Sequence, residues 1–207
     1  MQKIDLTKLY KAYYRAAKFP ELVQIEAAHF LSLCGKGDPS GEGFALDLQA
    51  LYSTAYALKF RYKALDKDFI VAKLEGLWSF DEQRYPGLSA AEAPKKIPRS
   101  QWKYLLLIRL PEFVGKEEVK TAIEQVFEKN KFDRVQDIFF HRMHEGKAVQ
   151  MLHTGPFDTE PESLLKIQAF IEFHGLQRNG EHHEIYLSDF RKTPPEKLRT
   201  ILREPVK

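Results

Sequence analysis

The sequence has a single cysteine, Cys34, among 207 residues. One thiol can form neither an intrachain disulfide nor a metal site with several cysteine ligands. Chains without disulfides are typical of reducing compartments, so we expect a cytoplasmic protein. We expect Cys34, on an apolar strand, to be an inert core thiol rather than a nucleophile.

Long hydrophobic runs are also lacking. The densest apolar stretch, residues 104–110, contains Arg109 and is far shorter than the run of about 18 apolar residues that a membrane-spanning helix needs. The N-terminal residues carry evenly spread cations without the apolar run or cleavage pattern of a signal peptide, and we expect an amphipathic helix within residues 1–20. A membrane partner is therefore not expected.

An excess of charge of one sign is lacking too. The chain has 32 Lys and Arg against 29 Asp and Glu, a net charge of +3, which does not by itself indicate nucleic-acid binding. Basic residues gather at residues 95–103 and 191–203, but no pattern of stacking aromatics accompanies them, and we interpret both clusters as solvated surface. With 43% hydrophobic and 29% charged residues, the composition is that of a folded globular protein.

Three segments have the apolar spacing of amphipathic helices. Apolar side chains recur every three or four positions in residues 44–62 and again in residues 119–127. A third helix is expected at about residues 162–174. Its start is marked by Thr159 as an N-cap and by Pro161 in the first turn.

Alternating apolar residues predict strands between these helices. The expected strands are residues 22–33, 69–80, 102–110, 135–143, 147–153 and 182–188. A turn at Glu145 and Gly146 would join two of them as a hairpin, and a short helix is expected from Thr193. Consecutive strands that can pair as hairpins predict an antiparallel sheet with helices on one face, which is an α+β fold.

The order of the predicted elements suggests two similar halves, at about residues 21–110 and 111–207. In each half a strand, a long helix and further strands follow one another, and residues 74–80 weakly resemble residues 184–190. We expect both halves to form one domain that spans residues 1–207.

Two familiar site patterns are incomplete. The glycine-rich residues 35–43 lack the ending of a phosphate-binding loop and have Ser40 where a dinucleotide-binding loop has its third glycine. The adjacent His182 and His183 point to opposite faces of a strand, so they cannot ligate one metal ion together. A metal site would then need pairings between distant histidines, and we expect no metal and no cofactor.

The last predicted strand holds the best chemical candidates. Period-two alternation places His182, Glu184 and Tyr186 on one face and His183 and Ile185 on the other. A carboxylate beside a phenol on an aromatic-lined surface could hold a cation, or position water while the phenol donates a proton. The alternative is a strand face open to solvent, which shows the same alternation.

Several stretches together resemble the GyrI-like small-molecule-binding family. They are residues 51–60 (LYSTAYALKF), 74–78 (LEGLW), 153–157 (HTGPF) and 182–189 (HHEIYLSD). Residues 195–206 (PEKLRTILREPV) are similar to the tail of stand-alone members of that family. The combination covers nearly the whole chain.

This resemblance implies tandem duplicated strand-helix-strand-strand modules that form a concave ligand site. The sheet would be antiparallel, with helices on one face and the ligand cleft on the other. The resemblance also implies a relation to the effector-binding domains of some transcription regulators. Those domains contact cationic lipophilic drugs through an acidic residue in the strand that matches Glu184. Some stand-alone relatives are hydrolases that open the strained cyclopropane of DNA-alkylating natural products.

The resemblance further implies roles for single residues. Glu184 would orient or activate water, Tyr186 would assist by hydrogen bonding or proton transfer, and Trp78 would be an aromatic wall. The ligand-binding candidates are Trp78, Tyr52, Tyr56, Glu75, Trp102, His153 and Phe157. Ser79 stands where family members often have a second tryptophan, which changes the shape expected of the pocket.

Three functions are consistent with the sequence. The first is hydrolysis of cyclopropane-containing genotoxins by Glu-activated water. The second is non-catalytic sequestration of planar or cationic drugs, and the third is a module that interacts with gyrase. We expect a small-molecule ligand, no nucleic-acid partner, and at most a weak homodimer.

Overall fold

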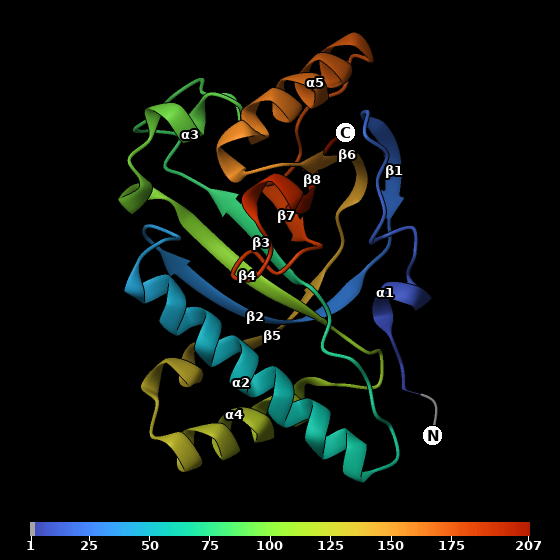
Figure 1. Ribbon diagram of the computed structural model, residues 1–207, viewed down its shortest axis with the longest axis vertical. Coiled ribbons are helices and arrows are strands. Elements are labelled where there is room, and N and C mark those ends of the chain that lie inside the picture. Colours follow the sequence, from blue (N-terminus) through green and yellow to red (C-terminus); the bar gives the residue numbers. More distant parts are fainter. Residues whose placement is uncertain (1–2) are drawn as a thin grey trace.

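The computed structural model describes residues 3–207. Within them, eight strands form one sheet in which every neighbouring pair is antiparallel (Figure 1). The strands are β1 (Glu21–Ile25), β2 (Ala28–Lys36), β3 (Leu74–Ser79), β4 (Lys103–Leu110), β5 (Phe139–Met143), β6 (Gly146–Thr154), β7 (His182–Tyr186) and β8 (Arg199–Pro205). The helices are α1 (Leu6–Leu9), α2 (Glu42–Ala64), α3 (Ala93–Lys96), α4 (Lys116–Asn130) and α5 (Glu160–Phe173). The predicted α+β class and antiparallel sheet are confirmed.

The strand order of the sheet is symmetric about its central pair of strands. It is β1-β6-β8-β7-β3-β4-β2-β5, with β3 of the first half and β7 of the second paired at the centre. In each half a strand, a helix and two further strands follow one another: β2, α2, β3 and β4, then β6, α5, β7 and β8. The predicted tandem of two modules is therefore confirmed.

The leading strand of each half pairs with a strand of the other half. β1 pairs with β6 of the second half, and β5 pairs with β2 of the first half. The prediction of one strand at residues 22–33 was therefore wrong, because the chain breaks at residues 26–27 and crosses to another part of the sheet. The predicted hairpin around Glu145 and Gly146 was wrong for the same reason, since β5 and β6 follow each other in sequence without pairing.

Other corrections concern the chain ends and the predicted third strand. The N-terminal helix is only α1, with Asp5 as its cap. The strand expected at residues 69–80 begins at Leu74 and runs without a bulge at Gly76. After a single turn at Pro195–Lys197 the chain forms β8, an unpredicted strand in which the buried charges of Arg203 and Glu204 interrupt the apolar alternation.

The two long helices of the modules cover one face of the sheet. From α2, Asp47 accepts a hydrogen bond of 2.9 Å from Tyr104 on β4, and from α5, Ser163 is 3.0 Å from a ring nitrogen of His153 on β6. Tyr104 is the cross-strand neighbour of Trp78, which in turn neighbours His182 on β7. Directly opposed residues share a face, so Trp78 and His182 lie on the helix-covered side.

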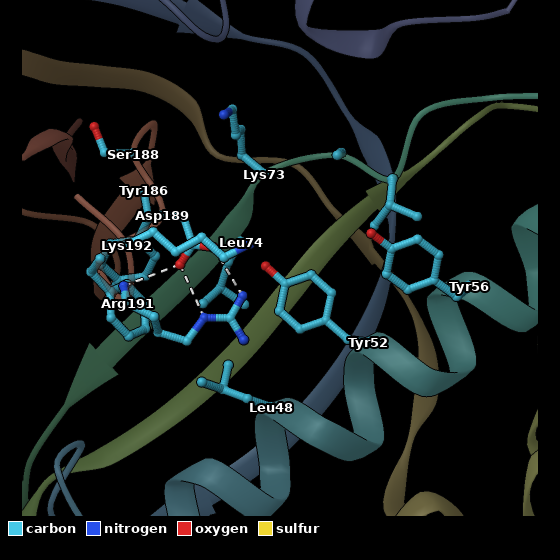
Figure 2. A pocket seen from close by; sticks show the side chains of 13 residues that line it. Leu48, Tyr52, Tyr56, Lys73, Leu74, Tyr186, Ser188, Asp189, Arg191 and Lys192 are labelled. Carbon is cyan, nitrogen blue, oxygen red and sulfur yellow. Dashed lines mark hydrogen bonds and ion pairs between the residues drawn. The ribbon is translucent and has the colours of Figure 1, made fainter.

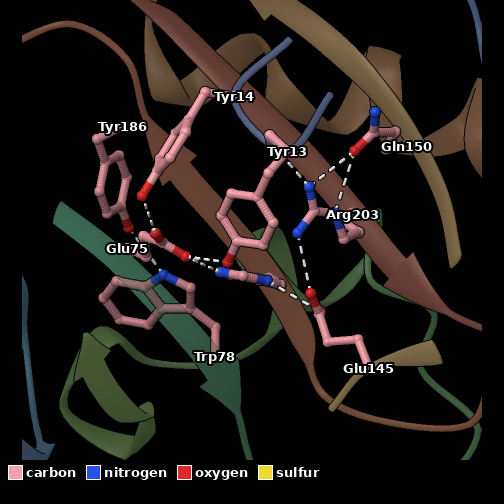
Figure 3. A network of polar contacts seen from close by, with 9 residues as sticks. Tyr13, Tyr14, Glu75, Trp78, Glu145, Gln150, Tyr186 and Arg203 are labelled. Atoms are coloured by element: carbon pink, nitrogen blue, oxygen red, sulfur yellow. Dashed lines mark hydrogen bonds and ion pairs between the residues drawn. The ribbon is translucent and has the colours of Figure 1, made fainter. Parts of the chain in front are cut away.

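A buried polar network occupies the other face (Figure 3). Glu75 on β3 is fully buried, and its carboxylate accepts hydrogen bonds from the hydroxyls of Tyr13 and Tyr14. The same carboxylate is 3.0 Å from Nε2 of His183 on β7. The N-terminal segment therefore covers this face with the side chains of Tyr13 and Tyr14, beyond the end of α1 at Leu9.

Arg203 connects this network to β6 and to the bend before it. Its guanidinium contacts Glu145 at 2.9 Å, the side-chain oxygen of Gln150 at 2.9 Å and the backbone carbonyl of Tyr13 at 3.1 Å. Burial opposes the charge of Glu145, but His183 and Arg203 lower the pKa of that carboxyl to about 2. The buried charges are thus paired across strands from both halves.

Two observations bear on the expectations from composition. Cys34 is exposed rather than in the core, because β5 covers β2 only as far as Ser32. Among residues 3–207, no helix is long and apolar enough to cross a membrane.

Candidate functional site

A cavity of about 390 Å³ lies above the centre of the sheet, between the start of α2 and the start of α5. We call it the main cavity. Its aromatic lining consists of Phe44, Trp78, Phe80, Trp102, Phe157, Tyr186 and Phe190. Its polar lining includes Ser40, Lys95, Arg99, Asp158, Glu160, Arg178, His182 and Glu184. Aromatic walls with a few convergent polar groups are typical of small-molecule sites.

The position of the main cavity corrects one expectation. The ligand cleft was predicted on the face opposite the helices, but Phe44 of α2 and Leu164 of α5 both line the cavity. The two helices diverge over the β3 and β7 pair (Figure 1). The cavity lies between the starts of the two helices.

The floor of the main cavity depends on close contact between β3 and β7. The indole Nε1 of Trp78 donates a hydrogen bond of 2.9 Å to the hydroxyl of Tyr186. A Cβ at Gly76 would lie 3.0 Å from that Nε1 and 3.3 Å from that hydroxyl, so glycine leaves space for both groups. Because its oxygen accepts from Trp78, the Tyr186 hydroxyl keeps its own proton for another acceptor.

Glu184 and its neighbours form a charged cluster on β7 and β8. Nδ1 of His182 is 2.7 Å from Glu204, and its Nε2 is 3.3 Å from Glu184, at ion-pair distance but without hydrogen-bond geometry. Arg178 donates to the second oxygen of Glu204 at 2.9 Å. Burial opposes the charge of His182, but Glu204 and Glu184 raise its pKa to about 10. Burial and the nearby Glu184 raise the pKa of Tyr186 well above its ordinary value.

Glu160, the first residue of α5, also lines the main cavity and lies near Glu184 and His182. It is buried, and its Oε1 has no hydrogen-bond partner among the described residues. Burial and the charge of Glu184 raise the pKa of Glu160 well above its ordinary value, which favours the protonated form of this carboxyl. The main cavity therefore contains two carboxyl groups, of which Glu160 is the better proton donor.

The raised pKa of His182 predicts a loss of stability at alkaline pH. A histidine whose pKa is raised by folding contributes stability that is fully present below about pH 6.5 and is lost as the pH rises toward 10. We expect the free energy of unfolding in urea to fall over this range by on the order of 2 kcal/mol more in the native protein than in His182→Gln. Equal pH slopes in the two proteins would contradict this assignment.

The structure brings part of the predicted site together. Glu184 and Tyr186 line the main cavity with Trp78, Trp102 and Phe157. The expectation that Glu184 and Tyr186 share one strand face is met, because both side chains enter this cavity from β7.

The other four candidates lie elsewhere. Tyr52 and Tyr56 line a second cavity. Glu75 belongs to the buried network on the opposite face, and His153 is held beneath α5 by Ser163. Neither Glu75 nor His153 reaches the main cavity.

Sequence reasoning missed Glu160 and the role of His182. Thr159 was expected to cap α5, but its hydroxyl donates to the backbone carbonyl of Pro156 and makes no cap hydrogen bond. Glu160 then resembles an ordinary acidic residue of a first helical turn, and only the fold reveals that it is buried. The alternation of β7 did place His182 beside Glu184, and this was the available signal. No group of three or more His, Cys, Asp or Glu residues in the described chain is arranged to hold a metal ion.

Comparison with known proteins identifies the family. The sequence model of the GyrI-like small molecule binding domain matches residues 110–207. Among solved structures, an uncharacterized conserved protein from Listeria innocua is 36% identical, with a TM-score of 0.88 over 99% of this chain and 100% of that chain. A protein described as a hydrolase from Listeria innocua is also 36% identical, with a TM-score of 0.85 over the same shares.

More distant relatives show the fold alone. The C-terminal domain of EcmrR is 12% identical, with a TM-score of 0.58 over 91% of this chain and 96% of that domain. No protein with curated function matches the chain. The full-length similarity to the Listeria proteins and the match to the domain model agree with the fold and the cavity described above. The chain belongs to the GyrI-like small-molecule-binding family.

Proposed function

We propose that this protein binds planar, lipophilic small molecules in the main cavity and adds water to an electrophilic carbon of the bound molecule. The observation that carries this proposal is the pair of carboxyl groups, Glu184 and the buried Glu160, inside an aromatic cavity. The substrate class would be compounds with a strained cyclopropane conjugated to a carbonyl group, such as DNA-alkylating genotoxins. The 36% identity to a protein described as a hydrolase supports a hydrolytic reaction.

The walls of the main cavity are suited to a flat ligand. Phe44 and Trp78 lie nearly parallel with ring centroids 6.2 Å apart, and Trp102 meets Trp78 edge to face at 6.4 Å. Aromatic rings of this kind bind a planar molecule by apolar burial and by stacking. A ligand that carries positive charge would also gain from the carboxylate of Glu184.

The proposed reaction uses both carboxyl groups. Glu184 accepts a proton from water, and the water oxygen forms a bond to the cyclopropane methylene carbon. The carbon–carbon bond of the ring breaks, and its electron pair moves through the conjugated system to the carbonyl oxygen. Glu160 donates a proton to that oxygen, so the product is the substrate plus one water molecule. Proton exchange with solvent then returns both acids to their starting states.

Tyr186 would position the water or the developing oxyanion. Its hydroxyl oxygen is occupied by the Trp78 indole, so its proton is directed to an acceptor inside the cavity. Burial keeps this phenol protonated at neutral pH, and it therefore acts as a hydrogen-bond donor.

The test is turnover of a cyclopropane-containing alkylating compound in water enriched in ¹⁸O. Loss of the conjugated chromophore should be faster with protein than without it, and one ¹⁸O atom should appear in the ring-opened product. Saturable quenching of Trp78 or Trp102 fluorescence without turnover would instead favour a sequestering protein. Absence of both turnover and quenching would overturn the proposal.

A further inference from the structure

A second cavity lies beside α2 and is lined in part by Tyr186 (Figure 2). Its volume is about 310 Å³. It is bounded by α2, by the segment before β3 and by the loop after β7. Its polar lining includes Tyr52, Tyr56, Lys73, Asp189, Arg191 and Lys192.

The two cavities share an aromatic wall. Tyr186 and Phe190 line both of them, and their ring centroids are 5.8 Å apart. Phe157 packs edge to face against both rings from the main-cavity side, at 6.0 Å from each. The second cavity is therefore a separate compartment whose occupant would contact the back of the ring that carries the Tyr186 hydroxyl.

The lining of the second cavity has an excess of positive charge. Lys73, Arg191 and Lys192 contribute three cations, and Asp189 contributes the only carboxylate among its lining residues. Asp189 is already paired, because its two oxygens accept hydrogen bonds of 3.0 and 3.2 Å from Arg191. Within residues 3–207 no carboxylate lies within 4.0 Å of the Lys73 ammonium, and the Lys73 side chain lies at the rim and extends away from Tyr52 and Arg191 (Figure 2).

Two phenols complete the polar lining. Tyr52 and Tyr56 lie one helical turn apart on α2, so both hydroxyls face the cavity (Figure 2). Neither hydroxyl has a hydrogen-bond partner among the described residues. Arg191 lies over the ring of Tyr52, 5.4 Å from its centroid, which fixes the guanidinium at the mouth.

We propose that the second cavity binds a small aromatic carboxylic acid in its anionic form. The rings of Tyr52, Tyr186 and Phe190 would pack against the ligand ring, and the apolar floor would bury it. The ligand carboxylate would accept hydrogen bonds from the two tyrosine hydroxyls and lie between the cations of the rim. This proposal does not depend on catalysis in the main cavity.

The test is calorimetric titration with benzoate and with benzamide, which has the same ring and no charge. Benzoate should bind saturably and benzamide at least tenfold more weakly. The double variant Lys73→Gln with Lys192→Gln should weaken benzoate binding roughly three- to tenfold, since each rim cation is partly exposed. The matched control is Lys95→Gln with Arg99→Gln, which removes two cations that line the main cavity and not the second.

Two results would overturn the proposal. One is equal affinity for benzoate and benzamide. The other is benzoate binding that survives the Lys73 and Lys192 changes but is lost in the control variant, which would place the anion in the main cavity. Tyr52→Phe should also weaken benzoate binding without changing the fold, as judged by circular dichroism. Glu184→Gln should leave benzoate binding unchanged, so failure of the proposed hydrolysis and failure of this site are distinguishable.

Discussion

Glu184→Gln is expected to lower kcat/KM for ring opening by roughly 10²–10⁴-fold, the usual contribution of a general base. The amide keeps the shape of the carboxylate but cannot accept a proton from water at neutral pH. Binding of the substrate, measured by tryptophan quenching, should change only a few-fold, because the aromatic walls remain. The measurement is the initial rate of chromophore loss at several substrate concentrations.

Two further variants make this result specific. Glu162→Gln removes an exposed carboxylate one turn into α5 and should leave the rate unchanged. Glu160→Gln preserves the neutral state of the buried side chain, so the fold should persist while the rate falls through loss of the proton donor. Hydrolysis at the native rate by Glu184→Gln would exclude Glu184 as the base.

Arg203→Met is expected to lower the free energy of unfolding by about 3–5 kcal/mol, the usual cost of removing one partner from a buried ion pair. Arg203 is fully buried, and its loss leaves Oε2 of Glu145 and the side-chain oxygen of Gln150 without their donor, while Oε1 of Glu145 keeps its contact with His183. Methionine fills most of the volume, so the effect measures charge and hydrogen bonding more than packing. Urea denaturation followed by circular dichroism provides the measurement.

Arg199→Met on the same strand is the matched control. Arg199 is exposed, and its replacement should change the stability by less than about 0.5 kcal/mol. Adding Glu145→Gln to Arg203→Met should recover part of the loss, because the second change removes a buried charge that Arg203 no longer balances. A similar effect of the Arg203 and Arg199 variants would show that the buried network does not stabilise the fold.

The sequence predicted those helices and strands whose positions follow from a local apolar pattern. The apolar spacing of α2 and α4, which each bury one side, and the alternation of β4 and β7 were sufficient to locate these elements, although both faces of the two strands are buried. The same alternation placed Glu184 and Tyr186 on one side of β7. Whether that side faced solvent or a cavity depended on where α2 and α5 diverge, which no local pattern encodes.

Features that depend on distant partners were not predicted. β1 and β5 each pair with a strand of the opposite half. Strands that follow each other in sequence usually pair, so the sequence favoured a hairpin around Glu145 and Gly146 instead. β8 was missed because Arg203 and Glu204 are buried in pairs with distant residues. Glu160 was missed because its burial is created by the second half folding against the loop after β3.

The exchange of leading strands makes the two halves inseparable. A fragment that ended after β4 would contain β1 without β6, β2 without β5 and β3 without β7, so three strands would each lose a pairing partner. Two copies of such a fragment could satisfy each other by the same exchange, so the intact chain is equivalent to a domain-swapped pair joined by one covalent connection. Cleavage of that connection near α4 should therefore give a nicked protein that stays associated, whereas either piece alone should aggregate.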